Sequence, residues 1–164
     1  MNETTGTGTP DPAAASSTGP GGALEYAPSP SERVRDQVAL YEATGGAEGG
    51  ELGGLPVIIL TTVGARSGQT RKTPIMRVEQ DGVYAAIASY AGRPVNPQWY
   101  YNLAAHPDAT VQDGPHLHRV RARELSGDEK QRWWAIADAL NPNYATYRST
   151  ADRDIPILAL EPVD

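Results

Sequence analysis

Residues 55–78 read Leu-Pro-Val-Ile-Ile-Leu-Thr-Thr-Val-Gly-Ala-Arg-Ser-Gly-Gln-Thr-Arg-Lys-Thr-Pro-Ile-Met-Arg-Val. The apolar run at residues 57–60 has the length and composition of a strand that is buried on both faces. A turn with two glycines follows, and residues 73–80 are predicted to form a second strand. Asp81-Gly82 is a strong hairpin turn into a third strand, residues 83–89. We expect these three strands to be antiparallel neighbours.

Positive charge gathers around the first of these turns in a chain that is otherwise acidic. The 164 residues carry a net charge of −6 at pH 7, yet no Asp or Glu occurs between Glu51 and Glu79. The segment between them contains four basic residues, Arg66, Arg71, Lys72 and Arg77. A local patch of uncompensated positive charge in an acidic protein indicates an anionic ligand.

The turn has the composition of an anion site. Gly64 and Gly68 permit backbone conformations in which several N–H groups point into one concavity, where a phosphate would fit. Arg66 and Arg71 would add bidentate contacts, and the Ser67 hydroxyl would add a further donor. The alternative is an ordinary hairpin turn with solvated arginines.

Two familiar motifs are excluded at this turn. It is not a nucleotide P-loop, because the lysine is not preceded by the required glycine. It is not the nucleophile elbow of a serine hydrolase, because Ala65 stands where that motif has its first glycine. The absence of cysteine from the sequence excludes disulfides, thiol catalysis and cysteine-ligated metals.

Several separated motifs resemble the deazaflavin (coenzyme F420)-dependent nitroreductase and quinone reductase family. They are residues 61–74, residues 96–107 and the closing residues 152–157, and the likeness covers about residues 31–162. The resemblance implies an α+β, mainly β fold, namely an antiparallel split β-barrel of the FMN-binding/pyridoxamine-phosphate-oxidase-like type with flanking helices. It also implies an oxidoreductase that passes hydride from reduced F420 to a quinone, nitroaromatic or activated alkene.

The resemblance also implies a set of site residues. The phosphate and acidic tail of the coenzyme would be held by Arg66, Ser67 and Gly68, with Arg71, Lys72 and Thr73 extending that hold. The ring would be bordered by Pro74, Ile75 and Met76, by Ile87, Ala88, Ser89 and Tyr90 opposite, and by Gln98, Trp99, Tyr100, Tyr101, Asn102 and Tyr144. The expected catalytic residues are Tyr144, Tyr147 and Ser89, with packing as the alternative role of the two tyrosines.

This chain departs from the family at five positions around the expected site. They are Ala65, where a basic residue is common; Met76, often an aromatic; Tyr90, often a lysine; and Asn141 and Thr150, a tyrosine and a tryptophan in the characterised nitroreductase. The departures predict a reshaped substrate pocket. Nitroimidazole activation is therefore not expected. The resemblance implies quinone reduction instead, because that is the natural reaction of close relatives.

The helices are predicted from periodicity and caps. A helix from Ser31, with Val34, Val38 and Tyr41 on one face, ends at Gly45-Gly46 and either caps the barrel or borders the site. Asn96 and Pro97 begin a helix that ends at His106, with Trp99 and Leu103 on its core face. In that helix Asn102 would donate to a bound ring or to the backbone.

The last third of the chain is predicted to contain a hairpin, two helices and a final strand. Residues 109–112 and 116–124 form the hairpin, with Asp113-Gly114 at its turn, and residues 155–160 form the last strand. Ser126 opens a helix whose core face is Trp133, Ile136, Ala137 and Leu140, and Asn143 caps the helix that carries Tyr144 and Tyr147. His116 and His118 share one strand face, but without a third ligand we expect no metal.

Domain organisation and location follow from composition. Residues 1–28 are rich in Thr, Gly, Pro, Ala and Ser and are predicted to be a disordered tail before a single domain, residues 29–164. The sequence has no secretory signal and no membrane-spanning stretch, so we expect a cytoplasmic protein, with peripheral membrane contact if its acceptor is a lipid quinone.

Two other functions remain open. One is an FMN-dependent oxidoreductase of the same barrel class, and the other is a non-catalytic coenzyme-binding protein. The acidic balance and the lack of a basic stripe with interleaved aromatics argue against nucleic acid. The partner is expected to be a small-molecule electron acceptor, and the protein a monomer or a homodimer.

Overall fold

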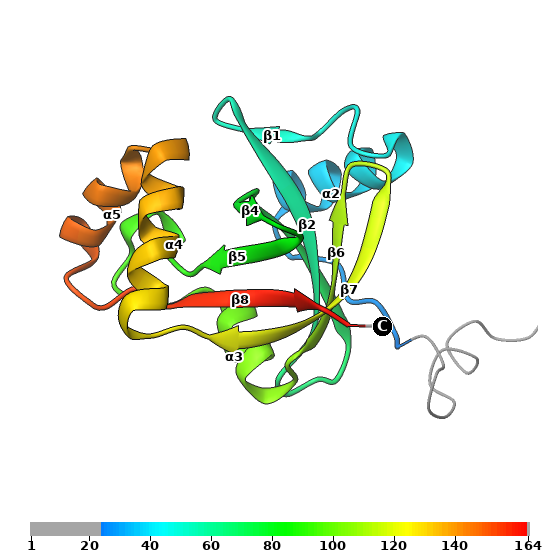
Figure 1. The fold of residues 1–164 in the computed structure, drawn as a ribbon. Coiled ribbons are helices and arrows are strands. Elements are labelled where there is room, and N and C mark those ends of the chain that lie inside the picture. Colours follow the sequence, from blue (N-terminus) through cyan, green and yellow to red (C-terminus); the bar gives the residue numbers. More distant parts are fainter. Residues whose placement is uncertain (1–23, 164) are drawn as a thin grey trace, which may run out of the picture.

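The structure, a computed structural model, describes residues 24–163, in which eight strands form one sheet with helices around it (Figure 1). The elements are α2 (Glu32–Thr44), β1 (Glu51–Leu52), β2 (Leu55–Val63), β3 (Thr70–Met76), β4 (Glu79–Gln80), β5 (Val83–Ile87), the 3₁₀ turn η1 (Tyr90–Gly92), α3 (Gln98–Ala105), β6 (Asp108–Asp113), β7 (His116–Glu124), α4 (Gly127–Leu140), α5 (Asn143–Ala151) and β8 (Ile157–Pro162). Most of the predicted tail lies outside the described residues.

The sheet is open between β3 and β5. Its strand order is β1-β2-β6-β7-β8-β5-β4, and β3 pairs with β2 off this path. The predicted strand over residues 73–80 is wrong in extent, because β3 ends at Met76 and β4 begins at Glu79. The predicted antiparallel order is confirmed in part: β2 pairs with β3, and β4 pairs with β5 across the predicted Asp81-Gly82 turn, but the other neighbour of β5 is β8. The chain thus turns away from β2 after β3, which leaves a split in the barrel.

β2 is buried on both faces, as its apolar run predicts. Ile58 and Leu60 point into the barrel core, where Trp99 and Leu103 of α3 also pack. Val57 and Ile59 point the other way and pack against Val38 and Tyr41 of α2. Four of the side chains that α2 and α3 were predicted to bury, namely Val38, Tyr41, Trp99 and Leu103, are buried, which confirms the core faces of the two helices.

α2 has the predicted ends. The Ser31 side chain accepts a hydrogen bond from the backbone N–H of Val34, and Gly45 ends the helix in the left-handed conformation at φ 61°. Figure 1 shows α2 and the paired helices α4 and α5 at opposite ends of the molecule. α2 therefore covers the outer face of β2 rather than joining the second helical layer.

α4 begins after Ser126 as predicted, but the Ser126 side chain makes no capping hydrogen bond. The predicted cap at Asn96 is wrong, because its side chain accepts from Arg153 instead, and α3 begins one residue later than predicted. At the start of α5 the predicted cap, Asn143, makes no capping hydrogen bond with its side chain. Its backbone N–H instead donates to the side chain of Asn141.

The core face predicted for α4 is confirmed at Ala137, and Trp133 and Ile136 pack partly buried against the core, but the prediction is wrong at Leu140 and omits Trp134. Trp134 is 7% exposed and Ala137 is buried, whereas Leu140, predicted to face the core, is 46% exposed and Trp133 is half-buried. The Trp134 ring lies edge-on to Tyr144, and the Arg148 guanidinium lies 4.1 Å from its centroid. Packing against α5 therefore sets the face that α4 buries.

The segment before α2 runs along the free edge of β3. The N–H of Thr70 donates to the carbonyl of Glu25, and the N–H of Ala27 donates to the carbonyl of Thr70. Composition assigns these residues to the tail, yet they pair with the sheet. They cover the first residue of β3 and leave the rest of its outer edge facing the split.

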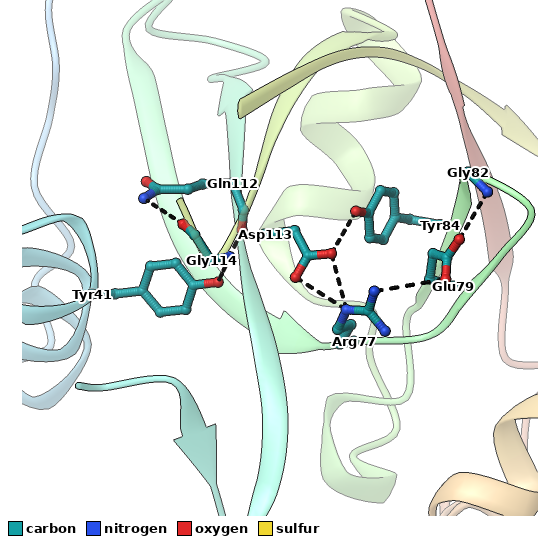
Figure 2. A network of polar contacts seen from close by, with 8 residues as sticks. All are labelled: Tyr41, Arg77, Glu79, Gly82, Tyr84, Gln112, Asp113 and Gly114. Atoms are coloured by element: carbon teal, nitrogen blue, oxygen red, sulfur yellow. Dashed lines mark hydrogen bonds and ion pairs between the residues drawn. The ribbon is translucent and has the colours of Figure 1, made fainter. Parts of the chain in front are cut away.

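The prediction that Arg77 belongs to the basic turn is wrong. It lies at the opposite end of the hairpin, where its Nε donates to both carboxylate oxygens of Asp113 at 3.0 Å (Figure 2). The Tyr84 hydroxyl donates to the same carboxylate at 2.6 Å, and burial, followed by this bond, raises the pKa of Tyr84. Tyr41 of α2 accepts from the N–H of Gly114 beside it. This network joins four separate elements at the closed end of the barrel.

Asp113→Ala should lower the free energy of unfolding by ~1–3 kcal/mol, because Arg77 and Tyr84 lose their shared acceptor in a partly buried site. The measurement is urea denaturation at pH 7. Asp108→Ala is the matched control, since that carboxylate is exposed and lies 3.9 Å from Arg121. Equal stability of the two variants would contradict a structural role for the network.

Candidate active site

A cavity of about 890 Å³ lies in the split between β3 and the end of β5. One wall is β3 from Arg71 to Met76, and the opposite wall is Ile87, Ser89 and the η1 turn. The first residues of α3 and α5 close one end, and the start of α2 with the β1–β2 turn closes the other. The opening of the sheet therefore creates the site.

The charge of this cavity is one-sided. Its lining contains four basic residues, Arg33, Arg71, Lys72 and Arg93, and no Asp or Glu. The chain as a whole has a net charge of −6. Since the surrounding protein is acidic, the lining concentrates positive potential where an anion would enter.

The structure brings most of the predicted site residues to the cavity. Those that line it are Arg71, Lys72, Thr73, Pro74, Ile75, Met76, Ile87, Ser89, Tyr90, Gln98, Trp99, Asn102, Tyr144 and Tyr147. Six others are not in the lining, namely Arg66, Ser67, Gly68, Ala88, Tyr100 and Tyr101. Ala88 is buried in the barrel core, and Tyr101 is exposed on α3. A hydrogen bond to Glu124 holds the Tyr100 hydroxyl and raises the pKa of Tyr100 to about 12.

The glycine turn uses most of its own N–H groups. Those of Gly64 and Gly68 donate to carbonyls within the turn, that of Gln69 donates to Ser67 Oγ, and that of Ala65 donates to Asn102. A side chain at Gly64 would place its Cβ 2.5 Å from Ser67 Oγ. These four N–H groups are therefore not available to form the predicted concavity for a phosphate. Arg66, Ser67 and Gly68 are exposed and lie outside the cavity.

Asn102 joins α3 to the basic turn. It is 2% exposed, and its Nδ2 donates to Thr62 Oγ1 at 3.0 Å. Its Oδ1 accepts from the N–H of Ala65 at 3.0 Å and from Gln98 Nε2 at 3.2 Å. Of the two predicted roles, the backbone contact is the one formed, and the side chain fixes the turn beside the cavity.

Arg71 and Lys72 also hold the segment before α2. Arg71 Nη1 donates to the carbonyls of Ala27 and Pro28 at 3.3 and 3.2 Å. Lys72 pairs with Glu42 of α2, and its Nζ lies 4.9 Å from the centroid of the Tyr26 ring. Both cations therefore line the cavity while stabilising its rim, and each keeps further donors for a ligand.

The three predicted catalytic residues lie around one end of the cavity. Tyr144 is 4% exposed, and burial, followed by the nearby Tyr147 and Asp138, raises the pKa of Tyr144 well above its usual value. Its ring is edge-on to that of Tyr147 at 6.0 Å. Among the described residues, no hydrogen bond occupies the hydroxyls of Tyr144 and Ser89, although both side chains line the cavity. They are free to donate to a ligand.

Two of the positions where this chain departs from the family are in contact. Asn141 Nδ2 lies 3.6 Å from the Met76 sulfur, and both residues line the cavity. Tyr90 lines it as well, while Thr150 packs against Gly92 behind the wall. Four of the five departures thus lie on or behind the wall around Tyr144, where they would change the shape offered to a substrate, while Ala65 lies in the glycine turn.

The start of α2 lines the other end of the cavity, in agreement with the predicted alternative that this helix borders the site, but the remaining residues of that end were not predicted. The lining there includes Ser29, Pro30, Arg33, Leu52, Gly53 and Leu55, and Arg93 lies at the opposite rim. The basic character of Arg33 and Arg93 was the one available signal, but neither lies near the basic turn in sequence. In residues 24–163, no three His, Cys, Asp or Glu side chains are grouped for a metal, and no helix is long and apolar enough to cross a bilayer.

The split barrel with a basic, acid-free cavity defines a class of oxidoreductases that bind a phosphate-bearing flavin-like coenzyme. Comparison with known proteins identifies the family. The model of the family described as F420H(2)-dependent quinone reductase matches residues 33–162, and the chain belongs to that family. It is therefore an F420H2-dependent oxidoreductase with coenzyme F420 as its cofactor, as the motifs predicted.

Individual relatives agree with this assignment. An F420H(2)-dependent quinone reductase of Mycobacterium tuberculosis (strain H37Rv) is 34% identical over 126 residues, 74% of this chain and 85% of that protein. A solved structure described as F420-H2 dependent reductase (FDR-A) is 45% identical with a TM-score of 0.62, over 65% of this chain and 94% of that one. Another, described as a domain-swapped dimer, is 41% identical with a TM-score of 0.64, over 81% and 100%. The fold is thereby confirmed as a split β-barrel of the FMN-binding/pyridoxamine-phosphate-oxidase-like type.

Asn102→Ala should lower the free energy of unfolding by ~1–3 kcal/mol, because Thr62 Oγ1 and the N–H of Ala65 lose their partner near the core. It should also weaken coenzyme binding, since the turn is no longer fixed. Thermal unfolding and coenzyme titration measure the two effects. Gln131→Ala, an exposed position on α4 away from the cavity lining, is the control; a loss of the same size there would contradict the role of Asn102.

Proposed function

We propose that this protein reduces a quinone with F420H2 bound across the split between β3 and β5. The observation that carries the proposal is the cavity lining, which has four basic residues and no acidic one in a protein of net charge −6. A coenzyme with a phosphate and a polyglutamate tail matches that charge, and the volume of about 890 Å³ suits a ligand of this size.

The residues present fit the coenzyme. Arg71 and Lys72 would hold the phosphate, and exposed Arg66, Ser67 and Gly68 would contact the tail beyond the cavity. Pro74, Ile75, Met76, Ile87 and Trp99 provide apolar walls for the ring. When bound, the coenzyme supplies a hydride. The protein binds and orients it and shields it from water.

The acceptor would lie at the end of the cavity formed by α5 and Ser89. The polar side chains there, Ser89, Asn141, Asn143, Tyr144 and Tyr147, are uncharged, which suits a neutral quinone. Reduction to the hydroquinone adds one hydride and one proton. A tyrosine phenol is protonated at neutral pH, and the burial that raises the pKa of Tyr144 keeps it protonated at higher pH as well. Its hydroxyl would donate a hydrogen bond and then the proton to the quinone oxygen. Solvent would return the proton to the phenol.

The assembly and location are part of the same proposal. A relative 41% identical forms a domain-swapped dimer, which supports a homodimer for this chain. A cytoplasmic protein would meet F420H2 in solution, and a lipid quinone would bring it into peripheral contact with the membrane. Size-exclusion chromatography with light scattering and vesicle sedimentation would measure these two properties.

Arg71→Ala should weaken F420 binding by ~10–100-fold, because it removes a charge-assisted contact worth ~1.5–3 kcal/mol. Quenching of Trp99 emission reports binding, since Trp99 lines the cavity and is 8% exposed. Arg121→Ala, on the exposed side of β7, is the matched charge control and should bind as wild type.

The same titration tests the cofactor. Wild-type protein should bind F420 in preference to FMN, and free polyglutamate should compete with F420. A preference for FMN would move the protein to the flavin-dependent branch of the fold. Tight F420 binding without turnover of any quinone would instead favour a non-catalytic coenzyme-binding protein.

Tyr144→Phe should lower kcat with a quinone by ~10²-fold or more and change coenzyme affinity little, because only the proton donor is removed. In wild type the raised pKa keeps the phenol protonated, so kcat should not fall through a Tyr144 ionisation until the pH exceeds the usual tyrosine value. Tyr101→Phe on the exposed face of α3 is the control. Equal losses of kcat and affinity in Tyr144→Phe would indicate packing alone.

A further inference from the structure

We propose that Arg153 is a positioning residue that fixes the Ser89–Arg93 wall of the cavity in the geometry needed for hydride transfer. The proposal rests on the proposed function and adds a residue that touches neither coenzyme nor acceptor. Arg153 lies between α5 and β8 and is not in the cavity lining.

The Arg153 side chain donates hydrogen bonds to several backbone carbonyls of one loop. Its Nη2 donates to the carbonyls of Ala88 at 2.9 Å, Val95 at 3.0 Å and Ser89 at 3.4 Å. Its Nε donates to the carbonyl of Arg93 at 3.1 Å, and Nη1 donates to Asn96 Oδ1. Every acceptor belongs to residues 88–96, and none is a carboxylate. The guanidinium therefore organises the backbone between β5 and α3 rather than pairing with a charge.

That loop is strained where it forms the cavity wall. Tyr90, Ala91 and Gly92 follow one another at φ 48°, 53° and 83°, in the left-handed region. Tyr90 and Ala91 are not glycines, so each disfavours this conformation. The loop has only two backbone hydrogen bonds across this turn, from Gly92 to Ser89 and from Arg93 to Tyr90. External donors are needed to hold it, and Arg153 supplies them.

The loop that Arg153 holds contains Ser89 and packs against α5, the helix that carries Tyr144 and Tyr147. A Cβ added at Gly92 would lie 3.4 Å from Tyr147 Cα and 3.3 Å from Thr150 Cβ, so the turn packs directly on α5. Ser89 and Tyr90 at one end of the loop and Pro97 just beyond its other end line the cavity. Relaxation of the loop would therefore displace Ser89 and the contact with α5 together.

Arginine is required by the number and directions of the acceptors. A guanidinium offers five N–H donors in a planar fork, which reaches carbonyls on both sides of the loop at once. A lysine ammonium has three donors at a single point and cannot span the same set. Charge alone would not replace the contacts.

The experiment compares Arg153→Met and Arg153→Lys with wild type, and Arg132→Met on the exposed face of α4 is the control. Hydrogen–deuterium exchange of the coenzyme-free protein should show faster exchange at the amides of Gly92 and Arg93 in Arg153→Met, by ~10-fold or more, with β6 and β7 unchanged. The kcat for quinone reduction should fall by ~10–100-fold, as expected for a misplaced reacting geometry, with the F420 Kd within about threefold of wild type. Arg153→Lys should not restore kcat.

Three results would overturn the proposal. They are unchanged exchange in residues 88–96, exchange that accelerates equally across the whole domain, and recovery of wild-type kcat by lysine. The exchange measurement needs no coenzyme, so it tests the clamp even if wild type neither binds F420 nor reduces a quinone. Failure of wild type to bind F420 and to reduce a quinone would remove the proposed function and leave Arg153 with a structural role only.

Discussion

The gap between β3 and β5 is the constraint on which the rest of the structure depends. Closed barrels satisfy every strand edge, whereas this sheet leaves most of the outer edge of β3 and the end of β5 without a strand partner. The cavity occupies that gap, and the residues around it come from α2, α3, α5 and two turns. The helices can therefore be understood as the elements that hold the two sides of the gap apart and close its ends.

Charge is distributed to suit this arrangement. Arg77 and Asp113 neutralise each other at the closed end of the barrel, where Tyr84 joins them. Arg71 and Lys72 stand only a few residues away in sequence, yet they face the open side, where no acidic side chain lines the cavity. Arg71 and Lys72 lie near the start of β3 and line the cavity, whereas Arg77 directly follows the end of β3 and belongs to the network with Asp113.

Rigidity is concentrated on the wall opposite β3. The turn Tyr90–Gly92 has positive φ at all three residues, and the carbonyls of Ala88 and Arg93 on either side of it accept hydrogen bonds from Arg153, which comes about sixty positions later in the chain. Asn102 plays a comparable part at the basic turn, where its amide joins Thr62 and Ala65. Both side chains fix backbone next to the cavity, and Asn102 also lines it. Among the positions that differ from the family, Met76 and Asn141 contact each other on the cavity wall, whereas Tyr90 lies in the turn beside the Arg153 contacts.

The sequence by itself determined the family, the cofactor, the β2–β3 hairpin and the two-faced burial of β2, because these depend on local periodicity, turn residues and contiguous motifs. It also identified most of the residues that line the cavity along β3, after β5 and on α3 and α5. Tertiary contacts alone determine that β5 pairs with β8 and not with β3. They also determine that Asn96 bonds to Arg153 instead of capping α3, and that Trp134 is more deeply buried than Trp133. The tertiary structure likewise brings Arg33 and Arg93 to the cavity and sets the hydrogen-bond partners of Arg77 and Arg153. The physical reason is that each of these depends on a partner distant in sequence, and local preferences worth ~1 kcal/mol or less yield to the packing and hydrogen bonds that such partners provide.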